Sequence, residues 1–414
     1  MQFLIVAPFI RLRSEGFISR HISIAEEMAL LGNEVIVVTS KFSHFAKKNR
    51  NFSRYFEKGV NYYFVPEVGY KNNRSFYRFL SHILLSINII IFLFKIKFAK
   101  RYSFDAIIST MPLGLLSLFI GVYAKLFKFK LFIDVQDKWP DIFVHLTYNL
   151  PYPINKLLEK YIKNSSIILR RILCVLSYGV IGVSEEYLDW YFSNVPENFY
   201  IHHILSEKLY LGSQFKNFLK VNKKINFKNK TQINLLIFGS LVQSYNFKLA
   251  VEAIKSLNQK ENNKEFRLTI IGSGPNFTEL KKYISTYSYI NLIPEIPFEN
   301  LYSYIEETDF LINPLRKNAS QSISNRLCDY LVSNKPVLTS SFPIELKEQK
   351  LNLFFYESDN VDSLINLILK LINSDYEIFS NFQKDTEKFY RKYSYPKFVK
   401  NFIFELNRLS KKVK

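Results

Sequence analysis

Short apolar runs alternate with longer segments of helical periodicity through the first half of the chain. One such helix is expected at Ile18–Leu31, and Gly32 follows it where a helix C-cap is wanted. Strand-helix alternation of this kind predicts a parallel sheet covered by helices on both faces. The expected strands lie at Phe3–Ala7, Glu34–Thr39, Val60–Val65, Ala106–Ser109, Leu131–Val135 and Val180–Val183.

The alternation lapses in a Lys- and Asn-rich stretch and then begins again. We interpret residues 206–232 as a linker between an N-terminal domain, residues 1–205, and a C-terminal domain, residues 233–390. A last helix, about residues 390–414 and opened by Pro396, is expected to pack back onto the first domain. The strands expected after the linker lie at Asn234–Phe238, Arg267–Ile271, Ile290–Ile293, Phe310–Asn313, Pro336–Thr339 and Asn352–Phe355.

This organisation predicts an α/β protein made of two Rossmann-like, doubly wound domains. The chain has 414 residues, about twice the length of a typical domain, and 48% of them are apolar, so each half can bury a core. Ligands of such sheets bind beyond the carboxyl ends of the strands. We therefore expect the active site in a cleft between the two domains.

Cysteine usage and the first residues favour a reduced, cytoplasmic setting. Cys174 and Cys328 lie in apolar helical contexts without CxxC spacing, which argues against a disulfide framework or a zinc site. The opening MQFLIVAPFI lacks a positive segment before its apolar run. We interpret it as a buried strand, not a signal peptide.

The net charge of +20 points to an anionic partner, although a coding bias towards Lys, Asn and Ile explains part of it. Residues 41–101 hold 13 Lys or Arg against Glu57 and Glu67. This region includes an uncharged run between Arg78 and Lys95 that is short of the roughly 20 residues needed to span a bilayer. A buried core helix, a helix in the membrane interface and a true span remain open. Four cations that can reach lipid headgroups follow the run: Lys95, Lys97, Lys100 and Arg101.

Two segments of the second half carry candidate chemistry. Gly272 and Gly274 lie between a strand and a helix, where glycine lets backbone N–H groups approach a phosphate, although tight turns of this kind are also common without a ligand. In NPLRKNASQSISNRLCDYLVSNKPVL, Ser322 or Ser324 can cap a helix that presents free N–H groups to a diphosphate.

The same helix is expected to offer two charged side chains on its polar face. Arg326 can face a diphosphate, and Asp329 can face a ribose. Their spacing of three residues also fits a solvated surface ion pair.

These motifs in this order resemble the donor-binding half of family 4 glycosyltransferases, which have the GT-B fold. The matching segments are GSL at Gly239, IIGSGP at Gly272, DFLINP at Asp309 and SNRLCDYLVSNKPVL at Ser324. The first half contributes SEGFISRHISIAEEMALLGNEVIVVTSKFSHF, and FIDVQDKWPDIF is similar to the DxxDxWP segment of bacterial surface-polysaccharide members.

The resemblance implies transfer from a UDP- or GDP-linked sugar with retention of configuration and without an essential metal. The second acid of the family's Glu-x7-Glu motif binds ribose, a role that passes to Asp329. Gln321 stands where the first acid is expected, while Asn325 and Arg326 match a variant of the motif. The Arg and Lys pair that follows the first glycine of the second domain is reduced here to Lys248.

In the first domain the resemblance places Gly16 in a loop facing the donor diphosphate. Arg20 and His21 open the next helix, Arg20 as a donor-binding residue and His21 as a catalytic candidate. Asp137 stands where relatives place a residue near the reacting sugar, so it can orient or deprotonate the acceptor hydroxyl, with Asp134 in support. Loop anchoring explains the two aspartates equally simply. His21 can likewise be an ordinary helix N-terminal residue.

Metal catalysis is disfavoured because no Asp-x-Asp occurs, and the adjacent His202 and His203 would face opposite ways on a strand. The leading hypothesis is an enzyme that adds a sugar to a lipid-linked oligosaccharide during O-antigen, capsule or other lipopolysaccharide or polysaccharide assembly. It would work as a peripheral protein on the anionic inner face of the cytoplasmic membrane. A sugar-nucleotide epimerase of the same fold and a catalytically silent glycan- or membrane-binding subunit are the alternatives. Nucleic-acid binding is suggested by charge alone and is set aside.

Overall fold

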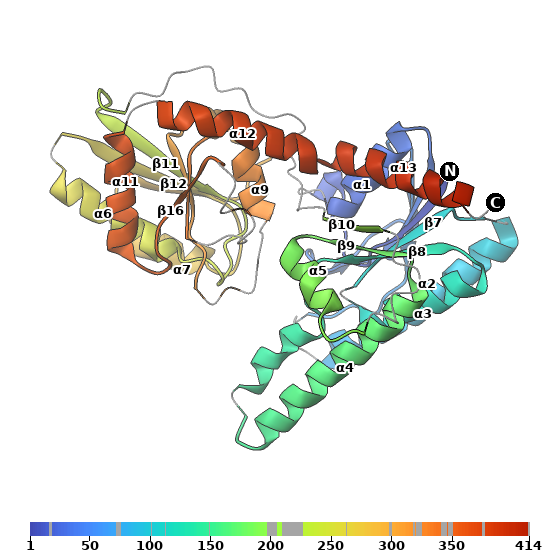
Figure 1. The fold of residues 1–414 in the computed structure, drawn as a ribbon. Helices are drawn as coiled ribbons and strands as arrows, with labels where there is room; N and C mark the ends of the chain where they lie inside the picture. The colour runs from blue at the N-terminus through green and yellow to red at the C-terminus, as the bar shows by residue number, and fades with distance from the viewer. Residues whose placement is uncertain are drawn as a thin grey trace. The chain divides into compact units, whose positions relative to one another are not determined.

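The computed structural model divides into two compact units that are described separately (Figure 1). The first comprises Met1–Tyr210 and Tyr395–Lys414, and the second Leu211–Ser394. The structure describes residues 1–15, 19–71, 76–100, 102–111, 113–148, 150–196, 205–208, 227–261, 263–297, 300–317, 319, 325–340, 346, 351–374 and 377–412.

The first unit contains an eight-stranded sheet in the order β10-β9-β8-β7-β1-β2-β6-β5. All neighbours are parallel except β5, which runs antiparallel to β6 at one edge. A separate antiparallel pair, β3 (Phe42–Ser43) and β4 (Lys48–Asn49), follows β2. The sheet strands are β1 (Gln2–Val6), β2 (Glu34–Ser40), β5 (Arg54–Glu57), β6 (Val60–Val65), β7 (Ala106–Thr110), β8 (Lys130–Val135), β9 (Gly179–Gly182) and β10 (Leu205–Lys208).

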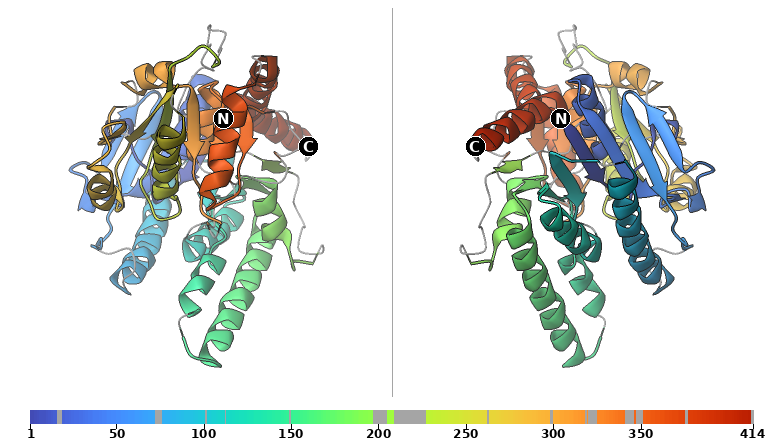
Figure 2. Two further views of the ribbon diagram at one scale, coloured as in Figure 1. Left: turned by 90° about the vertical axis from the view of Figure 1, so that its left-hand side faces the viewer. Right: turned by 90° about the vertical axis from the view of Figure 1, so that its right-hand side faces the viewer.

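Helices cover both faces of this sheet. On one face α2 (Phe76–Lys100), α3 (Gly114–Leu126) and α4 (Ile154–Leu176) lie side by side, and α1 (Arg20–Leu30) and α13 (Tyr395–Lys412) lie on the other (Figures 1 and 2). The remaining helical segments of this unit are η1 (Arg13–Glu15), η2 (Asp141–Thr147) and α5 (Glu185–Phe192).

The second unit contains a six-stranded parallel sheet in the order β13-β12-β11-β14-β15-β16. Its strands are β11 (Gln232–Phe238), β12 (Glu265–Ile271), β13 (Ile290–Ile293), β14 (Phe310–Asn313), β15 (Val337–Thr339) and β16 (Leu353–Phe355). Its helices are α6 (Phe247–Lys260), α7 (Phe277–Ile284), α8 (Leu301–Glu307), α9 (Asn325–Val332), α11 (Val361–Ile372) and α12 (Glu377–Tyr393).

In each sheet the chain adds strands on one side of its first strand and then continues on the other side. In the first unit the chain builds from β1 outward through β2 and β6 and then returns to the other side of β1 as β7. In the second unit it builds from β11 through β12 and β13 and returns beside β11 as β14. At such a reversal the loops that leave neighbouring strands diverge, so the carboxyl ends of β1 and β11 are where a ligand is expected.

Every strand expected from the sequence is present, with bounds that differ by at most two residues. Gly32 takes the left-handed conformation of a helix C-cap at φ 79°, and its N–H donates to the Ala29 carbonyl. Pro396 lies in the first turn of α13. The expected list omitted the short pair β3 and β4, the edge strand β5 and β10. β10 is a short strand that begins at the end of the expected first domain and runs into the Lys-rich stretch we had interpreted as linker.

The uncharged run of the sequence lies in α2, and the structure shows one buried and one exposed side of this helix. Tyr77–Ala99 is long and apolar enough to cross a membrane, and an 18-residue window within it has a mean hydropathy of 2.1 and is one-third buried. On the side of α2 that faces the sheet, Leu85, Ile89 and Leu93 are fully buried. The helix is the crossover between β6 and β7. The helix therefore packs on its own sheet with one side, as a core helix does. Its other side is exposed.

Candidate functional site

Two loops of the second unit touch at the carboxyl ends of β11 and β12, and glycine is what lets them do so. Gly239 ends β11 with φ 117°, and Gly272 follows β12. A Cβ at Gly272 would lie 2.0 Å from the Gly239 carbonyl oxygen, and one at Gly274 would lie 2.5 Å from the Leu241 carbonyl oxygen. The glycines therefore serve close backbone packing in their own right, and any contact with a donor comes in addition.

Arg326, in the first turn of α9, is a buried cation at the end of β11. Its guanidinium lies 3.9 Å from the centre of the Tyr245 ring, and Nη2 donates to the Ser240 carbonyl. Gly239 makes room for it, because a Cβ there would lie 3.1 Å from Nε. Only 6% of Arg326 is exposed, yet Nη1 has no hydrogen-bond partner among the described residues. An unpaired guanidinium N–H at this depth is costly and is well suited to an anionic oxygen.

Hydrogen bonds and packing fix α9 against the sheet. The Tyr330 hydroxyl accepts from the Phe238 N–H at 2.8 Å and donates to the Phe238 carbonyl at 3.1 Å, which ties the helix to the last residue of β11. Just beyond the helix, Lys335 Nζ donates to the carbonyls of Glu306 and Thr308. Arg326 thereby gains a fixed position relative to Gly239.

Burial corrects the expectation that α9 has a polar, solvated face. Asp329 is 5% exposed, so Arg326 and Asp329 are not a surface ion pair. Leu327 and Tyr330 are buried as well, and only Cys328 is half-buried among the residues Arg326–Val332, so little of this helix faces solvent. Two buried charges three residues apart on such a helix favour a binding role over a solvated one.

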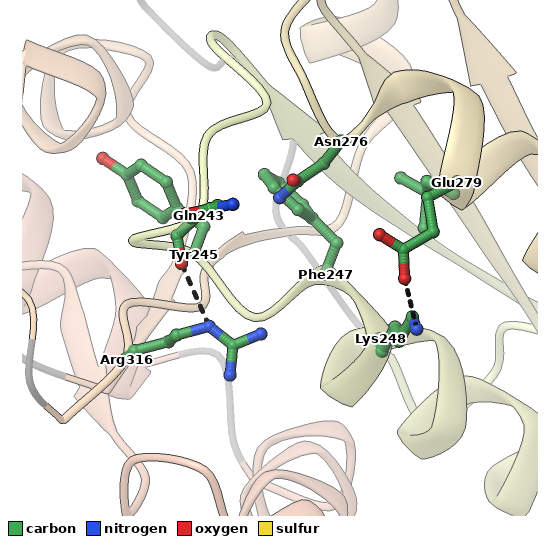
Figure 3. A pocket seen from close by; sticks show the side chains of 8 residues that line it. Gln243, Tyr245, Phe247, Lys248, Asn276, Glu279 and Arg316 are labelled. Atoms are coloured by element: carbon green, nitrogen blue, oxygen red, sulfur yellow. Dashed lines mark hydrogen bonds and ion pairs between the residues drawn. The ribbon is translucent and has the colours of Figure 1, made fainter. Parts of the chain in front are cut away.

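A pocket of about 340 Å³ opens beside these loops (Figure 3). Tyr245 and Phe247 contribute aromatic surface on one side. Lys248 reaches Glu279 at 2.7 Å across the pocket, and both side chains are at least half exposed, so this ion pair is weak. Arg316, from the loop after β14, donates through Nε to the Gln243 carbonyl at 3.1 Å. The pocket thus lies beside the paired loops after β11 and β14, which are joined by hydrogen bonds from the Asn246 N–H to the Pro314 carbonyl and from the Arg316 N–H to the Ser244 carbonyl.

In the first unit, Asp134 at the end of β8 gathers Arg20 and His21 from the start of α1. Its Oδ1 accepts from Arg20 Nη2 at 2.7 Å, and its Oδ2 lies 2.9 Å from His21 Nε2 and accepts from Gln136 Nε2 at 2.7 Å. Burial alone would raise the pKa of the fully enclosed Asp134 carboxyl, but Arg20, His21 and Gln136 outweigh it and hold the pKa at about 2. The carboxylate is therefore charged and fixes both side chains.

Asp137 stands apart from this network. Asp134, expected to support it, instead binds Arg20 and His21. The side chain of Asp137 reaches solvent, while the protein around it raises its pKa to about 6 by desolvation. Because the carboxylate of Asp137 contacts water, solvent screening weakens this rise in its pKa. An accessible carboxylate three residues beyond Asp134 is free to meet a substrate.

Several expected residues lie outside the described part of the chain: Gly16, Ser322, Ser324, Gln321, His202 and His203. Asn325 opens α9, and only its backbone is described. Within the described ranges no group of three or more His, Cys, Asp or Glu side chains is arranged to hold a metal ion.

Three contributors were missed at the sequence level. Tyr245 stacks on Arg326, Tyr330 ties α9 to β11, and Gln136 completes the Asp134 network. A signal existed for Gln136, which lies between two candidate aspartates. The partners of Tyr245 and Tyr330 are more than 80 residues away in the sequence, and no local pattern announces such a contact.

The two doubly wound units have the architecture of the GT-B fold of glycosyltransferases. Residues 232–374, most of the second unit, match the family model for group 1 glycosyl transferases, so this part of the chain is a group 1 glycosyltransferase domain. No curated protein matches the chain.

Solved structures share the architecture at low sequence identity. A sucrose-phosphate synthase from Thermosynechococcus elongatus superposes with a TM-score of 0.69 at 10% identity, over 100% of both chains. The HepE protein of Anabaena, in complex with UDP and glucose, gives 0.64 at 12% identity over 98% of each chain. A glycosyltransferase from Rickettsia africae gives 0.63 at 14%, over 99% of this chain and 98% of that one. At these identities the likeness establishes the fold.

Proposed function

We propose that this glycosyltransferase transfers a sugar from a UDP- or GDP-linked donor, with retention of configuration, to a lipid-linked oligosaccharide of bacterial surface-polysaccharide assembly. The observation that carries the donor part is Arg326, a buried guanidinium with an unpartnered N–H at the sheet reversal of the second unit. A donor diphosphate offers the oxygens that this group lacks. The UDP bound to HepE of Anabaena, a protein of the same fold, supports a nucleotide donor.

The donor would be held by residues of the second unit. Arg326 receives the diphosphate, and Lys248, released from its weak exposed pair with Glu279, adds a second cation. Asp329 receives the ribose hydroxyls in the manner of the family it resembles. Gly239, Gly272 and Gly274 keep the loops thin enough for a phosphate to approach the backbone. Gly16, Ser322, Ser324 and Asn325 are proposed as further donor contacts.

The acceptor would be handled by the first unit. Asp137 is the carboxylate proposed to orient the acceptor hydroxyl or accept its proton, because it reaches solvent beyond a strand end. The ionised Asp134 holds the His21 ring in one orientation, so His21 would lose little side-chain entropy on contacting the reacting sugar. Arg20 stabilises this arrangement from within the unit.

A lipid-linked acceptor would bring the enzyme to the inner face of the cytoplasmic membrane as a peripheral protein. The exposed side of α2 supports this location, since Tyr77, Leu84, Ile87, Ile91 and Phe98 are between 42% and 76% exposed along it. A soluble enzyme gains nothing from so much apolar surface in water.

The donor assignment is tested by titrating UDP and GDP into the wild type and single variants by calorimetry. Asp329→Asn is expected to weaken the preferred nucleotide more than tenfold, since two ribose hydroxyls lose a charged acceptor worth roughly 1.5–3 kcal/mol. Arg326→Ala should act at least as strongly, and Lys248→Ala less, because Lys248 is exposed.

The matched control is Lys370→Ala. Lys370 is an exposed residue in the last turn of α11, and it does not line the pocket beside the proposed site. If the Asp329 and Arg326 variants bind the nucleotide as tightly as the wild type and unfold at the same temperature, the donor does not bind at the carboxyl ends of β11 and β12. Sugar transfer to a lipid-linked acceptor separates the proposed enzyme from an epimerase.

Turnover is expected to continue without a metal ion. Arg326 and Lys248 would balance the charge that the leaving diphosphate gains, a task that a metal performs elsewhere. Transfer measured in excess EDTA should stay within about twofold of the untreated rate. Loss of activity that added Mg²⁺ or Mn²⁺ restores would contradict this assignment.

A further inference from the structure

The first unit carries a helical hairpin whose surface is unusually apolar. Residues 141–148 and 150–165 comprise η2 and the N-terminal half of α4, which pack against each other. Large apolar side chains here are exposed over a short length of chain: Phe143 38%, Tyr148 69%, Leu150 38%, Tyr152 79%, Ile154 51%, Leu157 70%, Leu158 38% and Tyr161 71%. We call residues 141–165 the η2–α4 hairpin.

The hairpin extends away from the body of its unit. No residue between Ile154 and Ser165 is buried, and the first buried residue of α4 is Ser166. From there Leu169 and Leu173 are buried and the helix packs on α3. Figure 1 shows the N-terminal half of α4 continuing past the sheet, with η2 beside it. The exposed side chains are therefore not covered by the unit's own core.

Positive charge accompanies this apolar surface. Lys156, Lys160 and Lys163 lie among the apolar residues of α4, and Glu159 is the single acid of that helix. Taken together, α2, α3 and α4 contain ten Lys or Arg and that one acid. Protein–protein interfaces are depleted in lysine, whereas an anionic bilayer attracts it. Tyrosines such as Tyr152 and Tyr161 suit the boundary between headgroups and acyl chains.

Neighbouring helices extend the same surface. Leu115, Val122 and Leu126 are exposed on α3, which lies between α2 and α4, and α2 contributes the exposed stripe already described. All three helices cover one face of the sheet (Figure 2). On the opposite face, the described residues of α1 and α13 include fewer large exposed apolar side chains, namely Leu30 and Phe404 with Leu31 at the end of α1.

We propose that the η2–α4 hairpin inserts into the headgroup region of an anionic bilayer and anchors the first unit there, with α2 and α3 against the same surface. The proposal rests on the proposed function for its purpose, which is to bring the enzyme to a lipid-linked acceptor. The chain connects the two directly, because Asp137 precedes η2 by only four residues. An anchored hairpin holds the loop of Asp137 close to the plane where the acceptor's lipid ends.

The experiment is co-flotation of the full-length protein with vesicles of phosphatidylcholine alone or with 30% phosphatidylglycerol, about the anionic content that gives a substantial surface potential. The test variant is Leu157→Ser with Tyr161→Ser, which removes two exposed side chains one turn apart. The control is Leu30→Ser with Phe404→Ser, at 74% and 67% exposure on the opposite face of the sheet. A charge variant replaces Lys156, Lys160 and Lys163 with Gln.

Wild type and control are expected to bind the anionic vesicles equally and the neutral vesicles less. The Leu157/Tyr161 variant should lose more than tenfold in partition coefficient. The lysine variant should lose binding at low salt and differ little from wild type at high salt, because salt screens the electrostatic attraction. Since the substituted side chains are exposed, tryptophan fluorescence should report an intact first unit.

The proposal is overturned if wild type ignores anionic vesicles, or if the Leu157/Tyr161 variant binds them as wild type does. It is also overturned if that variant abolishes self-association in sedimentation without affecting vesicle binding, since the hairpin would then pair with a second copy. Nucleotide titration keeps the two proposals apart. The hairpin variants should bind the nucleotide with the affinity of the wild type. A wild type that binds no nucleotide would instead refute the proposed function.

Discussion

Asp134 shows how one buried charge can organise a site. A fully enclosed carboxylate is unfavourable unless it is paired and hydrogen-bonded, and here Arg20, His21 and Gln136 satisfy both oxygens. The pKa of Asp134 is held at about 2, below its ordinary value of 3.8. The native state therefore favours the ionised form, and protonation must weaken it.

Acid should consequently destabilise the first unit through this residue. A depressed pKa contributes stability above about pH 4, and the contribution, about 2 kcal/mol, is lost as the pH falls towards 2. Asp134→Asn leaves Arg20 uncompensated and should cost about 3–5 kcal/mol near neutral pH, with a smaller difference from wild type below pH 4. Both tryptophans, Trp139 and Trp190, lie in the first unit, so fluorescence-detected denaturation reports it alone.

The control for this measurement is Asp189→Asn, at an exposed position on α5. It should unfold like the wild type across the same pH range. A gap between wild type and Asp134→Asn that stays constant down to pH 2.5 would mean that the carboxylate is not ionised in the native state.

At the scale of elements, the candidate donor site depends on how α9 is fastened to β11. The Tyr330 hydroxyl bonds both polar groups of the Phe238 backbone, and burial raises its pKa well above the ordinary value, so it stays protonated and can donate. The hydrogen bonds between Tyr330 and Phe238 fix the position of Arg326 relative to Gly239. Arg326 lies one helical turn before Tyr330, and Gly239 directly follows Phe238. Helix α9 thus fixes the position of the Arg326 side chain, and the absence of a side chain at Gly239 leaves room for it.

Tyr330→Phe should therefore loosen α9 without emptying the core. The Phe238 N–H and carbonyl lose their partner inside the protein, at a cost of about 1–3 kcal/mol. Amide hydrogen exchange of peptides covering residues 232–239 and 325–332 should accelerate accordingly. Tyr304→Phe, which removes a hydroxyl from a half-buried position on α8, should leave these peptides unchanged. Equal exchange in both variants would assign the fastening to ring packing alone.

At the scale of the whole molecule, the chain's last helix belongs to its first unit. Phe398, Val399, Phe402 and Leu406 are buried in the same core as Phe3 and Phe132, and the Phe402 ring lies 4.8 Å from that of Phe132. Such a connection makes the first unit depend on residues that follow the entire second unit. Its core is complete only when both ends of the chain are in place.

Phe402→Ala should destabilise the first unit by about 3–5 kcal/mol, the cost of a large cavity in a packed core. Phe404→Ala is the matched control, two residues away on the same helix and 67% exposed, and should change stability by no more than about 0.5 kcal/mol. Tryptophan fluorescence during denaturation measures both. Similar midpoints for the two variants would show that α13 is dispensable to this core.

The sequence by itself determined the fold and its order of elements. Buried parallel strands are uniform apolar runs and their crossover helices are periodic, so local pattern was enough for each central strand of both sheets. It failed at β5, an edge strand of mixed polarity, and at β10, which begins at the margin of the Lys-rich stretch. Gly239, Arg326 and Asp134 could be named in advance because motifs and strand ends mark them.

Only the tertiary structure decided what these residues touch. The sequence pattern predicted a polar, solvated helix face for Arg326 and Asp329, whereas the packing around α9 buries both. It also predicted that Asp134 supports Asp137, whereas Asp134 binds Arg20 and His21 of α1. The same holds for the hairpin, since an apolar stripe on α4 has one sequence pattern whether it is covered or exposed. Periodicity records which residues share a face, whereas burial depends on elements distant in the chain.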